Sequence, residues 1–149
     1  MKVLQATIDD AEILLDLQRA AYKSEAELHN DFKIPPLTQS LDELKDSFSQ
    51  KTILKIMDGD TILASGQAYL ESGTCHIGRM AVWPELQGKG IGSKLLSALE
   101  SAFPEASRVE LFTGEHSASN LAMYKHRGYI QFKTAQLGNT KVIFLERQL

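Results

Sequence analysis

The sequence contains almost no cysteine, no long hydrophobic run and no excess of basic residues, and each of these absences excludes a class of protein. The single cysteine, Cys75, cannot form an internal disulfide and lacks the partners of a zinc site, so we expect a packed thiol and no bound metal. No uncharged apolar run approaches the roughly 18 to 20 residues of a membrane span, and the first ten residues lack the apolar stretch of a signal peptide. A formal net charge of −3 argues against a duplex DNA binder, whose binding surface is basic. We therefore expect a cytoplasmic protein with neither a membrane nor a nucleic-acid partner.

What remains is the composition of an ordinary globular chain. The 149 residues are 43% hydrophobic and 23% charged, with no repeat, no low-complexity tract and no linker rich in proline, glycine or serine. A chain of this length buries roughly two-thirds of the surface that its unfolded form exposes, so we expect residues 1–149 to form one domain. The formal charge is −6 over residues 1–75 and +3 over residues 76–149. A basic C-terminal half suits a small phosphorylated ligand, and solvated surfaces explain the same asymmetry equally well.

Hydrophobic periodicity and turn residues predict the order of strands and helices. An apolar stripe at helical spacing starts at Ile91 and continues until Pro104 forbids it. Ser40 and Glu43 form a capping-box pattern that starts another helix, whereas the polar segment 24–39 predicts a loop or a broken helix. The fold class is α/β, a mixed and mostly antiparallel central sheet flanked by helices, in the order β-α-α-β-β-β-α-β-α-β-β. Strands are expected at 2–6, 52–57, 62–70, 74–82, 108–113, 129–137 and 140–146, and helices at 13–21, 40–48, 91–102 and 120–127.

A glycine-rich turn with the sequence QGKGIGS, residues 87–93, lies between a predicted strand and a predicted helix. Free backbone N–H groups and the positive end of a helix can hold an anion there, and phosphate is the natural ligand. The turn departs from the dinucleotide fingerprint G-x-G-x-x-G, because Ser93 stands at the third glycine position. It also departs from the loop G-x-x-x-x-G-K-[ST], because Leu95 follows Lys94. A turn that serves only strand-to-helix geometry is the alternative.

Within this turn, Gln87, Gly90 and Gly92 occupy the spacing Q-x-x-G-x-G, which resembles the acyl-CoA signature of the GNAT superfamily of N-acetyltransferases. The preceding strand ends in Met80-Ala81-Val82 and the following helix is amphipathic, as in that family. A second segment, residues 120–129, resembles the family's stretch with an Asn, an Ala, a Tyr and a closing Gly-aromatic pair. The predicted order of elements fits the family along the whole chain.

The resemblance implies transfer of the acetyl group of acetyl-CoA to a primary amine by direct attack within a ternary complex, with no metal. Backbone groups near Met80 and Val82 would bind the pantetheine arm like an added strand, and the amides of residues 88–93 would bind the pyrophosphate. A bulge in the strand 74–82, common in the family, would open that slot. The cofactor-binding residues implied are Met80, Ala81, Val82, Gln87, Gly88, Lys89, Gly90, Ile91, Gly92, Ser93, Asn120 and Tyr124.

The second segment supplies the candidate general acid, Tyr124. A phenol with an ordinary pKa of about 10 is protonated at neutral pH and can donate to the departing CoA thiolate. Asn120 lies one helical turn earlier on the same face, where its amide could hold the ligand or cap the helix.

A base is also needed, because a protonated amine must lose a proton before it attacks. His76 is the candidate, since alternation along its strand places it on the face of Met80 and Val82, although a structural role for this histidine is the alternative. The other candidates for the proton acceptor are Glu71, Glu115, His116 and a water relay.

The acceptor is the least determined part of the reaction. The acidic residues Glu25, Glu27 and Asp31 lie in the region that helps to form the acceptor site in the family, which favours a cationic small-molecule or protein amine, and surface solvation explains them equally well. A longer acyl donor stays open, because the phosphate signature reads CoA and not the acyl chain. The alternatives outside catalysis are a regulatory module that binds acyl-CoA and an interaction protein. Family members often dimerise, so a homodimer is one expected partner arrangement.

Overall fold

The chain folds into a seven-stranded sheet with helices on both faces. The structure, a computed structural model, describes all residues 1–149. The strands lie in the order β1-β2-β3-β4-β5-β7-β6, and every neighbouring pair is antiparallel except the parallel pair β4 and β5. The mixed, mostly antiparallel α/β fold predicted from the sequence is thus confirmed. The strands are β1 (Lys2–Gln5), β2 (Thr52–Asp58), β3 (Thr61–Glu71), β4 (Thr74–Val82), β5 (Arg108–Gly114), β6 (Ile130–Leu137) and β7 (Thr140–Gln148).

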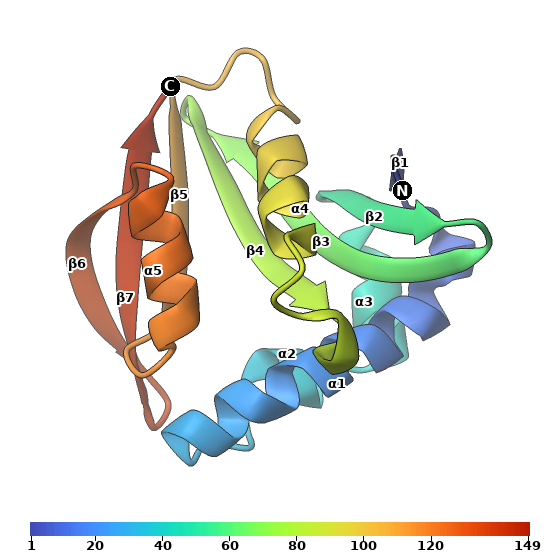
Figure 1. Cartoon of the computed structure of the whole chain (residues 1–149), viewed down its shortest axis with the longest axis horizontal. Coiled ribbons are helices and arrows are strands. Elements are labelled where there is room, and N and C mark those ends of the chain that lie inside the picture. The colour runs from blue at the N-terminus through green and yellow to red at the C-terminus, as the bar shows by residue number, and fades with distance from the viewer.

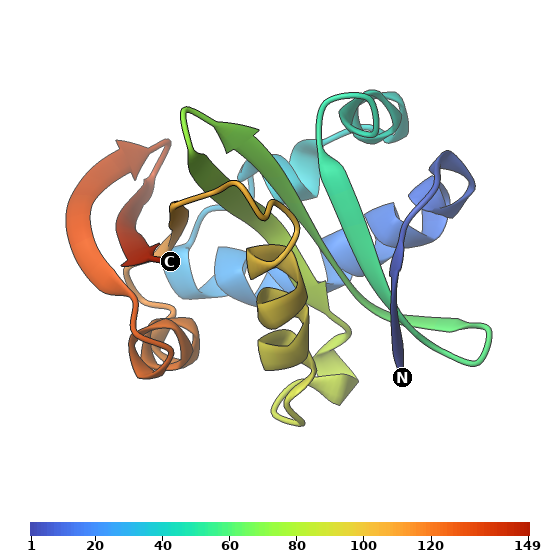
Figure 2. The ribbon, with the colours of Figure 1, turned by 90° about the horizontal axis from the view of Figure 1, so that it is seen from above.

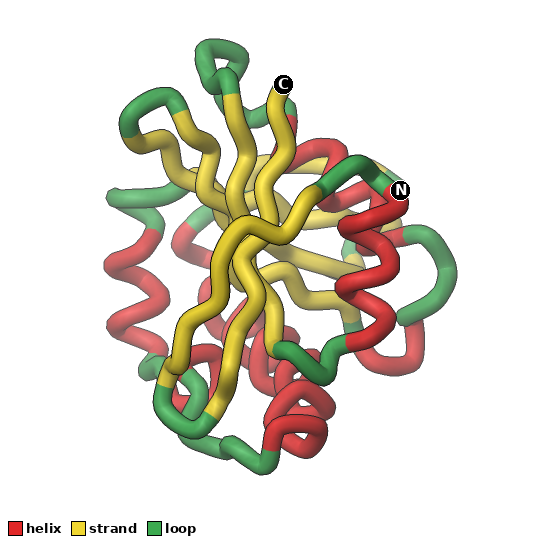
Figure 3. The backbone as a smooth tube through the Cα atoms, turned by 90° about the vertical axis from the view of Figure 1, so that its left-hand side faces the viewer, coloured by secondary structure: helices red, strands yellow, loops and turns green.

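The helices form two layers, one on each side of the sheet. Figures 1 and 2 show α4 (Ile91–Glu100) and α5 (Ala118–His126) on one side. The other side carries α1 (Ala11–His29), with α2 (Pro35–Thr38) and α3 (Leu41–Ser47) beside it. Two single-turn 3₁₀ helices, Ile8–Asp10 and Pro84–Leu86, complete the fold. In the side view of Figure 3, the strands twist between helices on both sides.

The region between β1 and β2 contains more helix than the sequence predicted. The helix α1 continues to His29 and ends where Asn30 adopts a left-handed conformation with φ of 48°. The segment expected to be a loop or a broken helix also contains α2, whose first turn starts at Pro35 because proline suits the first helical position. Three helices therefore replace the expected two. The predicted capping box is confirmed, since Glu43 N–H donates to Ser40 Oγ over 3.1 Å and Ser40 N–H donates to Glu43 Oε1 over 2.9 Å.

The hydrophobic core consists of two clusters separated by the sheet. Fifteen buried residues gather under α4, including Leu95 and Leu99, and nine gather under α1, including Leu17. Burial of each such side chain contributes about 1.5–3 kcal/mol. Cys75 belongs to the first cluster and is fully buried, and burial raises the pKa of its thiol to about 11. The packed thiol predicted from the sequence is confirmed.

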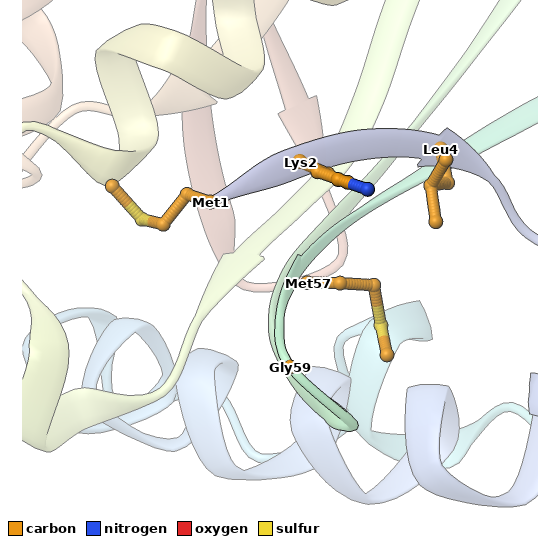
Figure 4. Close-up of a pocket in the computed structure, with 5 residues that line it drawn as sticks. All are labelled: Met1, Lys2, Leu4, Met57 and Gly59. Atoms are coloured by element: carbon orange, nitrogen blue, oxygen red, sulfur yellow. The ribbon is translucent and has the colours of Figure 1, made fainter.

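A hollow of about 310 Å³ lies at the edge of the sheet formed by β1 and β2. Figure 4 shows its lining residues, Met1, Lys2, Leu4, Met57 and Gly59. Apart from the Lys2 ammonium group, these side chains carry no titratable or nucleophilic group. The hollow lies at the β1 edge of the sheet, whereas the predicted site residues lie on or after the central strand β4.

Candidate active site

The central feature of the site is a gap between β4 and β5. These strands pair at only three positions, Thr74–His76 against Arg108–Glu110, although β4 continues to Val82 and β5 continues to Gly114. Beyond the paired end the strands diverge, and Figure 1 shows the gap widening towards α1 with α4 and α5 on either side. The facing backbone groups of both strands therefore have no β-ladder partner across the gap. An extended ligand chain could occupy it as an added strand.

A β-bulge lies in β4 along this gap. Gly66 of β3 faces two residues of β4, Arg79 and Met80. Arg79 is in the left-handed region with φ of 52°, and its Nη1 donates to Gln39 Oε1 over 3.0 Å. A bulge bends its strand and increases the local twist, which accounts for the divergence of β4 from β5. The bulge expected from the family resemblance is confirmed.

The bulge also reverses which residues of β4 face α4. Ile77 belongs to the core cluster under α4, and beyond the bulge Met80 and Val82 pack against the same cluster. His76, which precedes Ile77, therefore faces the opposite side of the sheet. The prediction that His76 shares a face with Met80 and Val82 is wrong, because simple alternation does not continue through a bulge.

His76 lies at the paired end of β4, next to an aromatic ring and two carboxylates. Its ring stacks on Tyr69 at a centroid distance of 4.7 Å, and its nitrogens lie 3.6 Å from Glu110 and 3.9 Å from Glu71. The structure thus surrounds His76 with side chains from β3 and β5. Its catalytic role stays a prediction from the sequence.

The glycine turn has the geometry of an anion site. Gly88 and Gly90 have φ values of 79° and 83°, which only glycine adopts without strain. The six backbone N–H groups of residues 88–93 donate to no acceptor within the protein, and the last three form the first turn of α4. The side chain of Gln87 reaches back to donate to the carbonyl oxygen of Val82 over 3.1 Å, which ties the turn to the end of β4. Unpaired amides at a helix N-terminus suit a phosphate or diphosphate group.

On the other side of the gap, α5 carries Tyr124. Its side chain is 6% exposed, its ring packs against Tyr129 at a centroid distance of 5.9 Å, and its hydroxyl has no hydrogen-bond partner in the protein. Burial raises the pKa of Tyr124 above its ordinary value, and the nearby Tyr22 and Glu25 raise it further. The phenol is therefore protonated at neutral pH and its proton is uncommitted. A protonated hydroxyl with no competing partner can donate to a departing thiolate, and the raised pKa makes Tyr124 a weaker acid than an ordinary phenol.

Asn120 does not cap the helix, because α5 begins at Ala118. Its Nδ2 lies 3.4 Å from both Glu25 Oε1 and Thr113 Oγ1, so its amide links α1, β5 and α5. Of the two roles predicted for Asn120, ligand binding and helix capping, the structure excludes helix capping.

Of the acidic residues near the predicted acceptor site, Glu25 and Glu27 lie in the last turns of α1, and Asp31 lies in the loop that follows the helix. Glu27 is exposed, whereas Glu25 accepts a hydrogen bond from Ser117 Oγ at the start of α5. Asp31 Oδ2 accepts from Thr140 Oγ1 over 2.7 Å and is buried against the β6–β7 hairpin. The hydrogen bond from Thr140 lowers the pKa of Asp31 below its ordinary value. Glu25 and Asp31 therefore connect α1 to the C-terminal part of the sheet.

Sequence reasoning missed several residues that surround the gap, among them Tyr22, Arg79 and Ser117. Burial raises the pKa of Tyr22 to about 12, with Arg79 opposing the shift and Glu25 adding to it. None of these residues belongs to either motif, and each comes near the gap only through the packing of α1 or the bulge in β4. Glu115 and His116 lie 3.4 Å apart near the surface, which agrees with their expected place in a loop.

Comparison with known proteins agrees with this geometry. A sequence model of the acetyltransferase (GNAT) family matches residues 13–129, and the chain therefore belongs to that family. No curated protein sequence matches the chain significantly. None of its helices is both long and apolar enough to cross a membrane. No group of three or more His, Cys, Asp or Glu side chains is arranged to hold a metal ion.

Solved structures share the whole fold at low sequence identity. PaiA N-acetyltransferase from Thermoplasma acidophilum, solved with coenzyme A, is 16% identical with a TM-score of 0.83, over 99% of this chain and 98% of that one. The protein smu.2055 from Streptococcus mutans UA159 is 20% identical with a TM-score of 0.81, over 99% of both chains. The putative acetyltransferase yncA from Salmonella typhimurium, solved with its cofactor acetyl-CoA, is 16% identical with a TM-score of 0.76, over 99% and 93%. At these identities the comparison shows the fold.

Proposed function

We propose that this protein transfers the acetyl group of acetyl-CoA to a primary amine by direct attack within a ternary complex. The observation that carries the proposal is the run of free amides at residues 88–93, at the start of α4, together with the β4–β5 gap that lies between α4 and α5, the helix that carries Tyr124 (Figure 1). The solved relatives with coenzyme A and acetyl-CoA support this cosubstrate. The acceptor is a small-molecule amine or a protein amine.

In this proposal the chain contributes mainly binding and orientation. The amides of residues 88–93 hold the pyrophosphate, with Gln87 keeping the turn against β4. Backbone groups of Met80, Ala81 and Val82 hold the pantetheine arm along the gap. Bound CoA supplies an activated acetyl thioester. Fixing an amine next to it replaces a bimolecular encounter, which is worth up to about 7–11 kcal/mol in ideal geometry.

Tyr124 acts in the chemical step as the proton donor. The amine nitrogen forms a bond to the acetyl carbonyl carbon, the carbon–sulfur bond breaks, and the departing sulfur takes the phenolic proton. The ammonium form of the amine loses one proton to water before it attacks, and the nitrogen loses a second proton to water as the amide forms. The phenolate is reprotonated from solvent. This step does not use His76, the base predicted from the sequence; that histidine lies at the paired end of β4 and faces the other side of the sheet from Met80. Asn120 holds α5, and with it Tyr124, in place against α1 and β5.

The experiment combines calorimetric titration with a CoA-release assay. We expect saturable binding of acetyl-CoA and CoA, with a longer acyl-CoA as comparator for the acyl-chain preference, followed by CoA release in a screen of amines. Tyr124→Phe should bind acetyl-CoA as the wild type does and release CoA about 10²–10⁴-fold more slowly. Tyr69→Phe, outside the gap, is the matched control.

The pH profile adds a second check on Tyr124. Because its pKa is raised, its protonated form persists above the ordinary value, and activity should not decline through Tyr124 between neutral pH and about pH 10. Full turnover by Tyr124→Phe would refute the acid assignment. Failure of the folded protein to bind acetyl-CoA would refute the proposed function, and binding without CoA release from any amine would favour the regulatory module. A homodimer and a cytoplasmic location stay predictions from the sequence.

A further inference from the structure

Most partly buried carboxylates in this protein have a fixed cation or several hydrogen-bond donors beside them. A carboxylate withdrawn from water loses hydration, and such a partner offsets the cost. Asp31 obtains three donors, Thr140 Oγ1 and the amides of Lys33 and Asn139. Four others, with 8% to 29% of the side chain exposed, each lie within 2.9 Å of a Lys or Arg nitrogen: Asp10, Glu100, Glu110 and Glu146.

Glu25 lacks such compensation. Its side chain is 22% exposed. The basic nitrogen closest to its carboxylate is Nδ1 of His29, which lies 4.0 Å from Oε2. His29 Nδ1 lies 2.8 Å from the backbone oxygen of Glu25, and His29 Nε2 accepts from the His116 amide over 3.0 Å. A ring that donates through one nitrogen and accepts through the other is neutral. The negative charge of Glu25 therefore has no cation beside it.

Two hydrogen bonds fix the position of this carboxylate. Ser117 Oγ donates to Oε2 of Glu25, and Asn120 Nδ2 donates to Oε1. A carboxylate offers about four acceptor positions, so roughly half of its capacity stays open. The same contacts place Glu25 at the start of α5, one turn before Tyr124, on the side where β4 and β5 have diverged.

Aromatic side chains lie near the open carboxylate. Tyr22 precedes Glu25 by three residues on α1 and therefore lies on the same face of that helix. Tyr124 lies across from them on α5, and the charge of Glu25 raises the pKa of both phenols. Arg79 acts electrostatically on Tyr22 and Glu43 and forms no ion pair with Glu25. An uncompensated carboxylate beside aromatic rings is suited to an organic ammonium group.

We propose that Glu25 binds the positively charged amine of the acceptor and so makes the enzyme selective for acceptors that are protonated at neutral pH. The inference rests on the proposed function and adds the residue that selects the substrate class. Glu25 contacts the acceptor through its charge, and Ser117 and Asn120 act as positioning residues that hold the carboxylate at the start of α5, near the end of β5.

The test is calorimetric titration of the CoA-saturated protein with amines and their uncharged analogues. The probes are benzylamine and 1,4-diaminobutane, each paired with the corresponding alcohol or diol. We expect at least one amine to bind more tightly than its analogue, and Glu25→Gln to weaken that amine at least tenfold without changing the analogue. Glu12→Gln removes the same charge from an exposed position on α1 and is the matched control. Ser117→Ala keeps the charge and loosens its support, so it should weaken the amine less than Glu25→Gln does.

The outcomes separate three explanations. Equal affinity of the amine for the wild type and Glu25→Gln, or no binding of either amine at millimolar concentration, would overturn the inference. Equal weakening of the amine and its uncharged analogue would also overturn it, because that result assigns Glu25 a purely structural role between α1 and α5. If acetyl-CoA itself does not bind, the proposed function fails first. If acetyl-CoA binds and CoA is released while Glu25→Gln behaves as the wild type, only this inference fails.

Discussion

The contact between Gly114 and His29 makes the substitution Gly114→Ala informative. Gly114 ends β5, and a Cβ at this position would overlap the imidazole of His29. The ring has little freedom to move, because its side chain is 4% exposed and both of its nitrogens are hydrogen-bonded. Gly114 has no positive φ, so the expected cost comes from the overlap and not from backbone strain. Alanine must therefore displace the ring or the end of β5.

The size of the effect follows from what displacement removes. Two hydrogen bonds, to the Glu25 carbonyl and from the His116 amide, contribute about 0.5–1.5 kcal/mol each. Forcing an extra methyl group into a packed contact adds about 1–3 kcal/mol. We expect Gly114→Ala to lower the free energy of unfolding by about 2–6 kcal/mol, the sum of these two contributions.

A double-mutant cycle measured by urea unfolding checks the cause. In a His29→Ala background the methyl group has room, so Gly114→Ala should cost little there, and the coupling between the two positions should account for most of the single-mutant effect. An equal cost of Gly114→Ala in both backgrounds would refute the reasoning, as would a single mutant as stable as the wild type.

Two further predictions concern the polar contacts of the fold. The carboxylate of Glu100 accepts hydrogen bonds from Arg127, Arg147 and Tyr129. Glu100→Gln should lower the free energy of unfolding, measured in urea, by about 2–4 kcal/mol. This cost is smaller than that of breaking a fully buried ion pair, because the Arg147 side chain is 37% exposed and solvent screens its charge. Glu105→Gln, at an exposed position, is the control, and equal stability of the two variants would show that solvent screens the network. For Asp31, a pKa lowered in the folded state contributes stability that is present above the ordinary pKa and is lost as the pH falls through the folded value. Asp31→Asn should therefore flatten the dependence of unfolding free energy on pH in the acid range, and an unchanged slope would contradict this assignment.

Local signals explain why much of the site could be predicted from the sequence. A positive φ at Gly88 and Gly90 and the free amides that follow them depend on a few consecutive residues. The capping box of Ser40 and Glu43 is equally local, and it was confirmed in detail. Periodicity likewise predicted the strand β4 with its observed bounds. The segment 24–39 was harder, because Ala26 is the one buried residue in the part of α1 that it contains, so too few apolar positions recur to reveal a helical period.

The face of His76 was predicted wrongly for a reason that no local pattern reveals. The bulge depends on how β4 registers against β3, with Gly66 opposite two residues. Gly66 lies close under α4, where a Cβ would come within 2.7 Å of Leu99 Cδ1. The packing of a helix some thirty residues further along the chain thus helps to fix the backbone here. Alternation assumes a regular strand, and the tertiary contacts make this one irregular.

The sequence by itself determined the order of the strands, the glycine turn before α4 and the helical segment that carries Tyr124, because those features are encoded within short stretches of chain. The tertiary structure decided the divergence of β4 from β5, the face of His76 and the meeting of Glu25 with Ser117, which are 92 residues apart in the chain. The physical reason is that a side chain's environment is set by packing between distant segments. A single sequence specifies which residues are available, and the fold determines which of them meet.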